Sequence, residues 1–368
     1  MKIFTVLGAR PQFIKAATVS RAIKARNDIQ ELIVHTGQHF DASMSDVFFE
    51  QLDIPRPNYN LGIASLSHGA MTGRMIEALE ELVKKEKPDL VLVYGDTNST
   101  LAGALASVKL GLTVAHIEAG LRSHNPTMPE EINRVLTDRV SSLLLCPSDT
   151  AIKNLKEEGF PFRANKNGLQ RIYNVGDVML DSVIYYRELA KRSVKLTQFG
   201  LVDKSYVLCT LHRQENTDSK ERLSNIIDAL RQIARDIQVV MPLHPRTKAK
   251  FREQFSVKSL KDLNILEPVP YLQMQRLQMS ARAILTDSGG VQKEAYFHKV
   301  PCITLRDETE WMETVDESWN KLVGADPKKI IEATLNITPP SVIQKPLYGD
   351  GKAADQILQA LSELMIRR

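Results

Sequence analysis

Three acidic residues stand where the sequence predicts the ends of buried strands or the start of a helix. Asp96 lies in "YGDTNST", Glu118 in "HIEAGLR" and Glu130 in "PEEINR". Because ligands bind outside the carboxyl ends of parallel strands, Asp96 and Glu118, which follow neighbouring strands, are expected to face one site. Carboxylates that share a site can be tuned apart into a general acid and a general base. The sequence therefore indicates proton transfer.

A simpler interpretation of these stretches stays open. Asp96 is followed by Thr97, Asn98 and Ser99, which are all helix-capping types. His116 lies within a strand and is interpreted as a packed histidine rather than a catalyst.

The segment "PEEINR" is also a well-made helix start, with a proline followed by acidic residues. Glu130 and Arg134 are spaced i, i+4, so we expect them to form one hydrogen-bonded unit in which the arginine orients the carboxylate. Glu131 is interpreted as a charge that only favours the helix start.

Two further stretches are typical of anion binding. In "LGARPQFIK", Gly8 allows a tight turn, Arg10 lies beside a probable helix start and Lys15 follows about a turn later. In "ILTDSGGVQKEA", residues 288–290 let backbone N–H groups wrap a phosphate, and Glu294 is placed to accept from ribose hydroxyls. A plain turn followed by solvated charges is the alternative at both places. Neither stretch is a GxGxxG or P-loop motif, so neither NAD nor nucleoside-triphosphate chemistry is indicated.

Histidines and arginines follow two other predicted strands. "YVLCTLHRQEN" has His212, Arg213 and Glu215 after its strand, and "VVMPLHPRT" has His244 and Arg246. His212 is a candidate proton donor or phosphate contact.

The elements that must position these residues are short apolar strands alternating with amphipathic helices. Strands are expected at 2–7, 31–35, 90–94, 113–117, 142–146, 206–211, 237–242, 283–286 and 302–305, with helices such as 72–85 and 220–233 between them. Apolar strands separated by helices predict parallel sheets covered on both faces. The pattern runs twice, so we expect an α/β protein with two Rossmann-like, doubly wound domains that divide near the polar segment 165–177.

Composition limits the function classes. The chain has 368 residues, 43% of them hydrophobic and 25% charged, and a net charge of +4, which is too weak to indicate nucleic-acid binding. Cys146, Cys209 and Cys302 lie in apolar runs and are expected to be buried, inert thiols, which suits a reducing cytoplasm. No run reaches the about 20 apolar residues of a membrane span, and no signal peptide is expected.

Taken together, the motifs resemble the non-hydrolysing UDP-N-acetylglucosamine 2-epimerase family. The resemblance rests on "GARPQFIK", "YGDTNST", "HIEAGLRS", "PEEINR", "HRQEN", "HPRT", "LTDSGGVQKEA" and "YGDGKAA", which occur in order along nearly the whole chain. It implies a GT-B fold with an interdomain cleft, a homodimer, a UDP-sugar substrate, and no metal or other cofactor. It also assigns the last helix to the N-terminal domain, which gives domains of 1–170 plus 353–368 and of 171–352.

The resemblance further implies a mechanism and site residues. UDP would leave by anti elimination across C1–C2, giving a 2-acetamidoglucal, and would then add back after the opposite face of C2 is protonated. The implied catalytic residues are Arg10, Asp96, Glu118, Glu130, Arg134 and His212. The implied UDP-sugar contacts are Arg10, Lys15, His212, Val269, Met274, Ser288, Gly289, Gly290, Glu294 and Arg306. A possible activator site for a second UDP-sugar matches Gln38, Arg74, Arg213 and His244, although "GQHFD" departs from the family's usual pattern there.

Two departures favour one branch of the family. Gln12 stands where the common UDP-N-acetylglucosamine enzymes carry Glu, and Trp311 replaces an arginine that contacts the ligand. Both features resemble the branch acting on UDP-2,3-diacetamido-2,3-dideoxy-glucuronate for surface polysaccharide, because Gln12 removes a negative charge that would oppose the uronate. UDP-N-acetylglucosamine stays the alternative substrate. A GT-B glycosyltransferase, a UDP-sugar hydrolase and a catalytically silent UDP-sugar sensor are the alternative functions.

Overall fold

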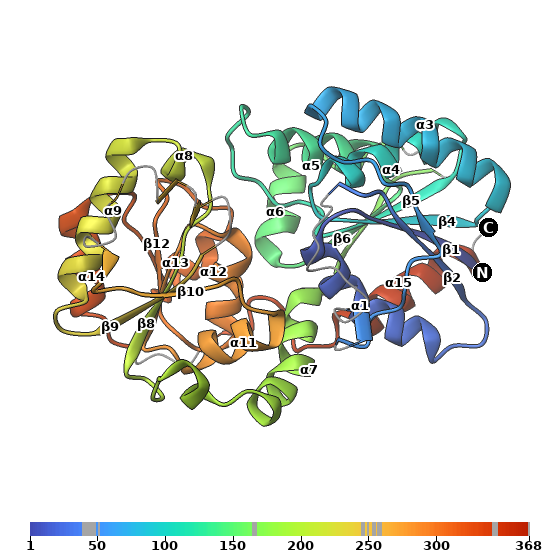
Figure 1. The fold of residues 1–368 in the computed structure, drawn as a ribbon. Helices are drawn as coiled ribbons and strands as arrows, with labels where there is room; N and C mark the ends of the chain where they lie inside the picture. The colour runs from blue at the N-terminus through green and yellow to red at the C-terminus, as the bar shows by residue number, and fades with distance from the viewer. Residues whose placement is uncertain are drawn as a thin grey trace. The chain divides into compact units, whose positions relative to one another are not determined.

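The chain forms two compact units in a computed structural model, which describes residues 1–38, 49–50, 52–163, 168–243, 247–248, 250–251, 255, 260–340 and 345–366. The first unit comprises Met1–Ser182 and Pro346–Arg368, and the second comprises Val183–Lys345. Each unit contains one parallel sheet, so the predicted α/β class with two doubly wound sheets is confirmed (Figure 1).

The sheet of the first unit has the strand order β3-β2-β1-β4-β5-β6-β7. Its strands are β1 (Lys2–Leu7), β2 (Gln30–His35), β3 (Tyr59–Asn60), β4 (Leu90–Tyr94), β5 (Thr113–Ile117), β6 (Leu143–Cys146) and β7 (Arg171–Asn174). Its helices are α1 (Arg10–Lys24), α3 (His68–Glu86), α4 (Asn98–Lys109), α5 (Pro129–Val140), α6 (Asp149–Glu157) and α15 (Ala353–Ile366). Helix α7 (Val178–Ser193) begins in this unit and ends in the second.

The sheet of the second unit has the order β10-β9-β8-β11-β12-β13. Its strands are β8 (Tyr206–Thr210), β9 (Gln238–Pro242), β10 (Asn264–Leu266), β11 (Ala283–Thr286), β12 (Cys302–Thr304) and β13 (Asn320–Leu322). Its helices are η3 (Leu196–Phe199), α8 (Gln214–Thr217), α9 (Lys220–Ile233), α11 (Tyr271–Ser280), α12 (Gly289–Phe297), α13 (Met312–Asp316) and α14 (Pro327–Leu335).

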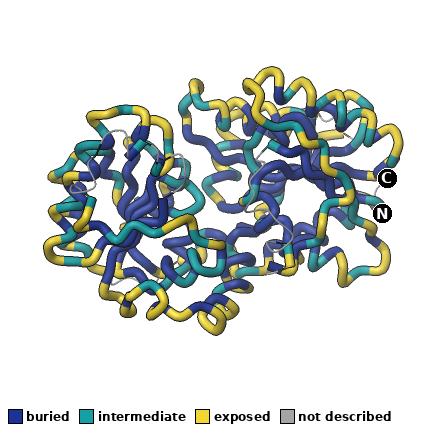
Figure 2. The backbone as a smooth tube through the Cα atoms, in the orientation of Figure 1, coloured by how far each residue is buried: buried dark blue, intermediate teal, exposed yellow. Residues whose placement is uncertain are grey.

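The central strands are buried on both faces, as their unbroken apolar sequences require. All five residues of β4, "LVLVY", are buried, and the strands form the dark core of each unit in Figure 2. In the second unit, residues of α9 and α14 pack on one face of the sheet, and residues of α11 and α12 pack on the other (Figure 1). These layers leave the loops after the strands as the places where polar side chains gather.

The segment expected to link the two domains contains a strand. β7 lies within it and pairs with β6, so the first unit extends beyond residue 170, to Ser182. Because β7 is short, polar and only half-buried, its sequence lacks the apolar run of an inner strand. At the other end of the chain, α15 packs against α1 within the first unit.

Candidate active site

Asp96 and Glu118 follow the adjacent strands β4 and β5. Glu118 is buried and adopts a left-handed conformation with φ of 72°, which is uncommon for a residue with a side chain and is often found at functional sites. Its carboxylate lies against Gly95, the residue before Asp96, because a Cβ at Gly95 would be only 3.2 Å from Glu118 Oε2. The structure therefore brings the loops that carry these two carboxylates together.

Arg134 of α5 connects Asp96 to Glu131. Its Nη2 donates to Asp96 Oδ2 over 2.5 Å, and its Nη1 donates to Glu131 Oε2. The Glu131 carboxylate also accepts from the backbone N–H groups of Ser123 and His124. Burial alone would raise the pKa of Glu131, but these donors and Arg134 hold it below its ordinary value.

The expected pairing of Arg134 with Glu130 is wrong. On a helix an i, i+3 pair is as close as an i, i+4 pair, and the loop donors at Ser123 and His124 capture Glu131. Glu130 is half-buried and makes no hydrogen bond or ion pair with another described side chain. Glu131 is thus the buried carboxylate that holds the start of α5 to the loop after β5.

Lys15 and Gln12 connect α1 to the same strand ends. Lys15 Nζ lies 2.6 Å from Glu118 Oε2 and neutralises its charge. Gln12 is 3% exposed, accepts from the backbone of Gly8 and Ala9, and donates 2.7 Å to the Tyr94 carbonyl. Gln12 therefore fastens the turn after β1 to the end of β4, while Arg10, half-buried, is the first residue of α1.

Asn133 is a site residue that the sequence reasoning missed. Its Nδ2 donates 2.9 Å to the Asp96 carbonyl and 3.2 Å to Asn98 Oδ1. Its place within "PEEINR", one residue before Arg134, was the available signal.

In the second unit, Ser288 is the N-cap of α12 and its side chain makes no capping hydrogen bond. A helix start leaves backbone N–H groups without helical partners, which favours an anion there. A Cβ at Gly289 would lie 2.4 Å from Glu310 Oε1, so a larger residue would displace the Glu310 carboxylate, whereas Gly290 faces open space. The Ser288 N–H itself is bonded to Thr286 Oγ1 over 2.9 Å.

Glu294, farther along α12, is held by two amides of α11. Gln275 Nε2 donates to it over 2.9 Å and Gln278 Nε2 over 2.7 Å. His298 Nε2 lies 2.8 Å from Gln275 Oε1, and burial lowers the pKa of His298 to about 3, so its ring is neutral and Nε2 donates. This series of hydrogen bonds fixes the carboxylate of Glu294, a residue that is 7% exposed.

His212 is oriented by Asp287, a residue missed from the sequence although it directly precedes Ser288. His212 Nδ1 lies 3.1 Å from Asp287 Oδ1, and the His212 side chain is 50% exposed while that of Asp287 is fully buried. Asp287 also accepts from the backbone of His212 and Arg213. Burial would raise the pKa of Asp287, but His212 and these N–H groups lower it overall. Asp287 is therefore an anion that lies on the Nδ1 side of the His212 ring. The Nε2 atom, on the other side of the ring, points away from Asp287.

The other predicted contacts are spread over the second unit. Arg306, after β12, is 1% exposed and donates 2.9 Å to Glu310. Val269 and Met274, before and within α11, are partly buried against the core.

The residues matched to an activator site belong to both units. Gln38 Oε1 accepts from Ser99 at the start of α4, whereas Arg74 is exposed on α3. Arg213 belongs to the second unit, and His244 lies outside the described residues.

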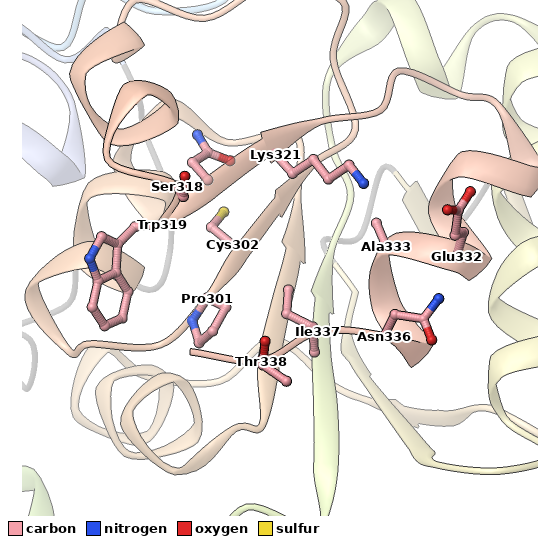
Figure 3. A pocket seen from close by; sticks show the side chains of 11 residues that line it. Pro301, Cys302, Ser318, Trp319, Lys321, Glu332, Ala333, Asn336, Ile337 and Thr338 are labelled. Carbon is pink, nitrogen blue, oxygen red and sulfur yellow. The ribbon is translucent and has the colours of Figure 1, made fainter. Parts of the chain in front are cut away.

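A pocket of about 220 Å³ in the second unit lies at the amino ends of β12 and β13. Pro301 and Cys302 line one side, and Glu332 of α14 and Asn336, the C-cap of that helix, line another (Figure 3). None of the predicted site residues lines it. In the part of the chain that the structure describes, no cluster of three or more His, Cys, Asp or Glu side chains is placed to hold a metal ion, and no helix is long and apolar enough to cross a membrane.

Comparisons with known proteins agree with the motifs. The family model described as UDP-N-acetylglucosamine 2-epimerase matches residues 21–362. The chain is 51% identical to a "UDP-N-acetylglucosamine 2-epimerase homolog" of Methanococcus maripaludis, over 99% of this chain and 100% of that protein. It is 50% identical to the UDP-2,3-diacetamido-2,3-dideoxy-D-glucuronate 2-epimerase of Pseudomonas aeruginosa, with the same coverage.

A solved structure is similar over the whole chain. It is the UDP-GlcNAc 2-epimerase of Methanocaldococcus jannaschii in complex with UDP-GlcNAc and UDP, with a TM-score of 0.89 and 44% identity over 99% of this chain and 100% of that one. The chain therefore belongs to the UDP-N-acetylglucosamine 2-epimerase family and is a UDP-sugar 2-epimerase, an isomerase with a GT-B fold.

Proposed function

We propose that this enzyme inverts C2 of UDP-2,3-diacetamido-2,3-dideoxy-D-glucuronate, giving the manno epimer for surface polysaccharide. The observation that carries the proposal is the 50% identity, along the full length, to the Pseudomonas aeruginosa enzyme named for that sugar. The Methanocaldococcus jannaschii enzyme named for UDP-N-acetylglucosamine is 44% identical, so that sugar is the second candidate.

Two residues that depart from the common pattern of the family, Gln12 and Trp311, support a uronate substrate. Gln12 is neutral, so it adds no negative charge beneath the ends of β1 and β4. Beside Trp311, which replaces an arginine, the Lys293 ammonium lies 4.2 Å from the centre of the indole ring. A cation is thus kept near the glycine turn of α12, where it favours an anionic ligand.

The proposed reaction is an elimination followed by an addition. A carboxylate removes the C2 proton, the C1–O bond breaks and its electron pair leaves with the β-phosphate of UDP, giving the glycal. A second acid then protonates the other face of C2 as the phosphate oxygen attacks C1 again. Asp96, Glu118 and Glu130 supply the acid and base groups, and Arg134 keeps Asp96 oriented.

The second unit supplies the groups for the departing nucleotide. The turn at Ser288–Gly290 and the exposed ring of His212 stabilise the diphosphate, and Glu294 accepts from the ribose hydroxyls. Arg10 and Lys15 add positive charge from α1. We further propose that the enzyme is a homodimer and is located in the cytoplasm. Light scattering checks the dimeric state.

A competition assay tests the substrate. Equal concentrations of the two UDP-sugars are incubated with the enzyme, and each manno epimer is followed by NMR. The proposal expects kcat/KM to favour the uronate at least tenfold. A preference for UDP-N-acetylglucosamine would reject this substrate while leaving the reaction class intact.

A further inference from the structure

A buried ionic cluster lies directly behind the two carboxylate loops of the first unit. It consists of His116 on β5, Asp138 on α5, Arg122 in the loop after β5 and Glu158 after α6. The side chains of His116 and Asp138 are fully buried. Charged groups buried so deeply are costly, so their hydrogen bonds must be complete and their geometry well defined.

His116 bridges the end of β4 to helix α5. Its Nε2 lies 2.7 Å from the carbonyl oxygen of Gly95, which can only accept, so Nε2 carries a hydrogen and donates. Its Nδ1 lies 2.7 Å from Asp138 Oδ1. Burial would raise the pKa of Asp138, but His116 and Arg122 lower it, so the carboxylate is held as an anion.

Asp138 carries the connection on to the loop after β5. Its Oδ2 accepts from the backbone N–H of Gly120 over 3.1 Å and from Arg122 Nη1 over 2.7 Å. Gly95 directly precedes Asp96, and Gly120 lies two residues after Glu118. One histidine–aspartate pair is therefore bonded to the backbone beside both carboxylates. Asp138 is also one helical turn after Arg134, the residue that contacts Asp96 itself.

We propose that His116 and Asp138 are positioning residues of the epimerase, which set the separation of the Asp96 and Glu118 carboxylates across the reacting carbon. This inference rests on the proposed roles of those two carboxylates. Their spacing matters because groups that act on one carbon must be held within reach of it, and a displacement of about 1 Å in such a site lowers a rate about 100-fold. What points to positioning is where the partners of His116 lie: one is the Gly95 carbonyl directly before Asp96, and the other, Asp138, is bonded to the Gly120 N–H two residues after Glu118.

Two substitutions separate the two connections. In His116→Asn the amide nitrogen falls near the place of Nδ1 and keeps the bond to Asp138, while the bond to Gly95 is lost. In His116→Gln the amide nitrogen falls near the place of Nε2 and keeps the bond to Gly95, while the bond to Asp138 is lost. The proposal expects each variant to lose about 10- to 100-fold in kcat, with the KM for the UDP-sugar within about twofold.

The matched control is Gln170→Leu. Gln170 is buried and donates to the backbone carbonyls of Asp138 and Ser141, but it bonds neither the Asp138 carboxylate nor the backbone of Gly95 or Gly120. It should lower the melting temperature like the His116 variants while keeping kcat within threefold. Rates are expressed per UDP-binding site, counted by calorimetric titration, so misfolded protein does not enter kcat.

The assay uses whichever UDP-sugar the wild-type enzyme turns over, so failure of the proposed substrate does not affect it. A kcat within threefold of wild type in both His116 variants, or an equal loss in Gln170→Leu, overturns the positioning role.

If the His116 variants bind no UDP, Glu158→Gln decides, because Glu158 is at the surface end of the cluster and holds Arg122 through 2.6 Å and 2.8 Å bonds. There a two- to fivefold lower kcat at unchanged KM supports the role, and an unchanged kcat overturns it.

Discussion

Arg134 reaches from α5 to the end of β4 and donates a 2.5 Å hydrogen bond to Asp96. The same guanidinium bonds Glu131, so a buried carboxylate on one side and a half-exposed one on the other share one cation. Adjacent acidic residues of one motif thereby acquire different roles. Glu131 is fixed inside the protein, and Glu130 is the one of the two that we propose for proton transfer.

Isosteric substitutions should separate these two glutamates. Glu130→Gln is expected to lower kcat about 10²- to 10⁴-fold, the usual effect of removing an acid or base, with little change in melting temperature. Glu131→Gln should instead destabilise the protein by about 1–3 kcal/mol, because the amide opposes the N–H groups that the carboxylate accepts. Calorimetry and initial rates on both variants provide the measurement. A stable, inactive Glu131→Gln together with an active Glu130→Gln would reverse the assignment.

Substitutions of His212 and Asp287 should have coupled effects on kcat but different effects on the free energy of unfolding. His212→Gln replaces a half-exposed side chain and should change the free energy of unfolding by less than about 0.5 kcal/mol while lowering kcat. Asp287→Asn should lower both, because the buried carboxylate also accepts backbone N–H groups. If the rate losses multiply in the double variant, the two residues act independently and the orienting role of Asp287 is refuted.

Gln12→Glu tests the charge argument for the uronate. The substitution should reduce kcat/KM for the uronate more than for UDP-N-acetylglucosamine, because it adds a negative charge. It should also destabilise the protein, since a carboxylate cannot donate to the Tyr94 carbonyl. Gln12→Met is the uncharged control: like Glu it cannot donate to the Tyr94 carbonyl, and it also loses the bonds accepted from Gly8 and Ala9. If both variants change the ratio of kcat/KM for the uronate to kcat/KM for UDP-N-acetylglucosamine equally, the charge of residue 12 does not select the substrate.

Asp181 should make the first unit less stable as the pH rises. Burial raises its pKa to about 6, although its carboxylate accepts from the backbone of Ala353 and Ala354 at the start of α15. Between about pH 4 and 6 the folded state holds more protons than the unfolded state, so the free energy of unfolding falls by up to about 3 kcal/mol across this range. Asp181→Asn should flatten that slope in melting experiments, whereas Asp355→Asn, on the exposed side of α15, should flatten it only slightly, because Asp355 is the smallest of the causes that raise the pKa of Asp181. Parallel slopes for wild type and Asp181→Asn would contradict the assignment.

The sequence predicted the inner strands and missed the outer ones. β3, β7, β10 and β13 are the edge strands of the two sheets, and all four were absent from the expectation. An inner strand is buried on both faces and shows an unbroken apolar run, whereas an edge strand such as β7 is half-buried and mixed in sequence. Periodicity therefore finds the centre of a sheet more readily than its border.

The predicted site shows the same limit at the level of side chains. Asp96 and Glu118 were predicted to lie together because the topology of parallel strands requires it. The partner of Arg134 was not predictable, because it depends on loop N–H groups at Ser123 and His124 that no helical spacing reveals. Asp287 was missed because its role appears only when the ends of β8 and β11 lie side by side.

Proton exchange at C2 tests the central claim most directly. The enzyme is incubated in deuterated water with UDP-2,3-diacetamido-2,3-dideoxy-D-glucuronate and, separately, with UDP-N-acetylglucosamine, and C2 is followed by NMR. The account predicts deuterium at C2 of a UDP-sugar that keeps its nucleotide, with the faster exchange on the uronate, and a loss of exchange in Glu130→Gln. Release of free sugar, or no exchange with either substrate, would contradict it.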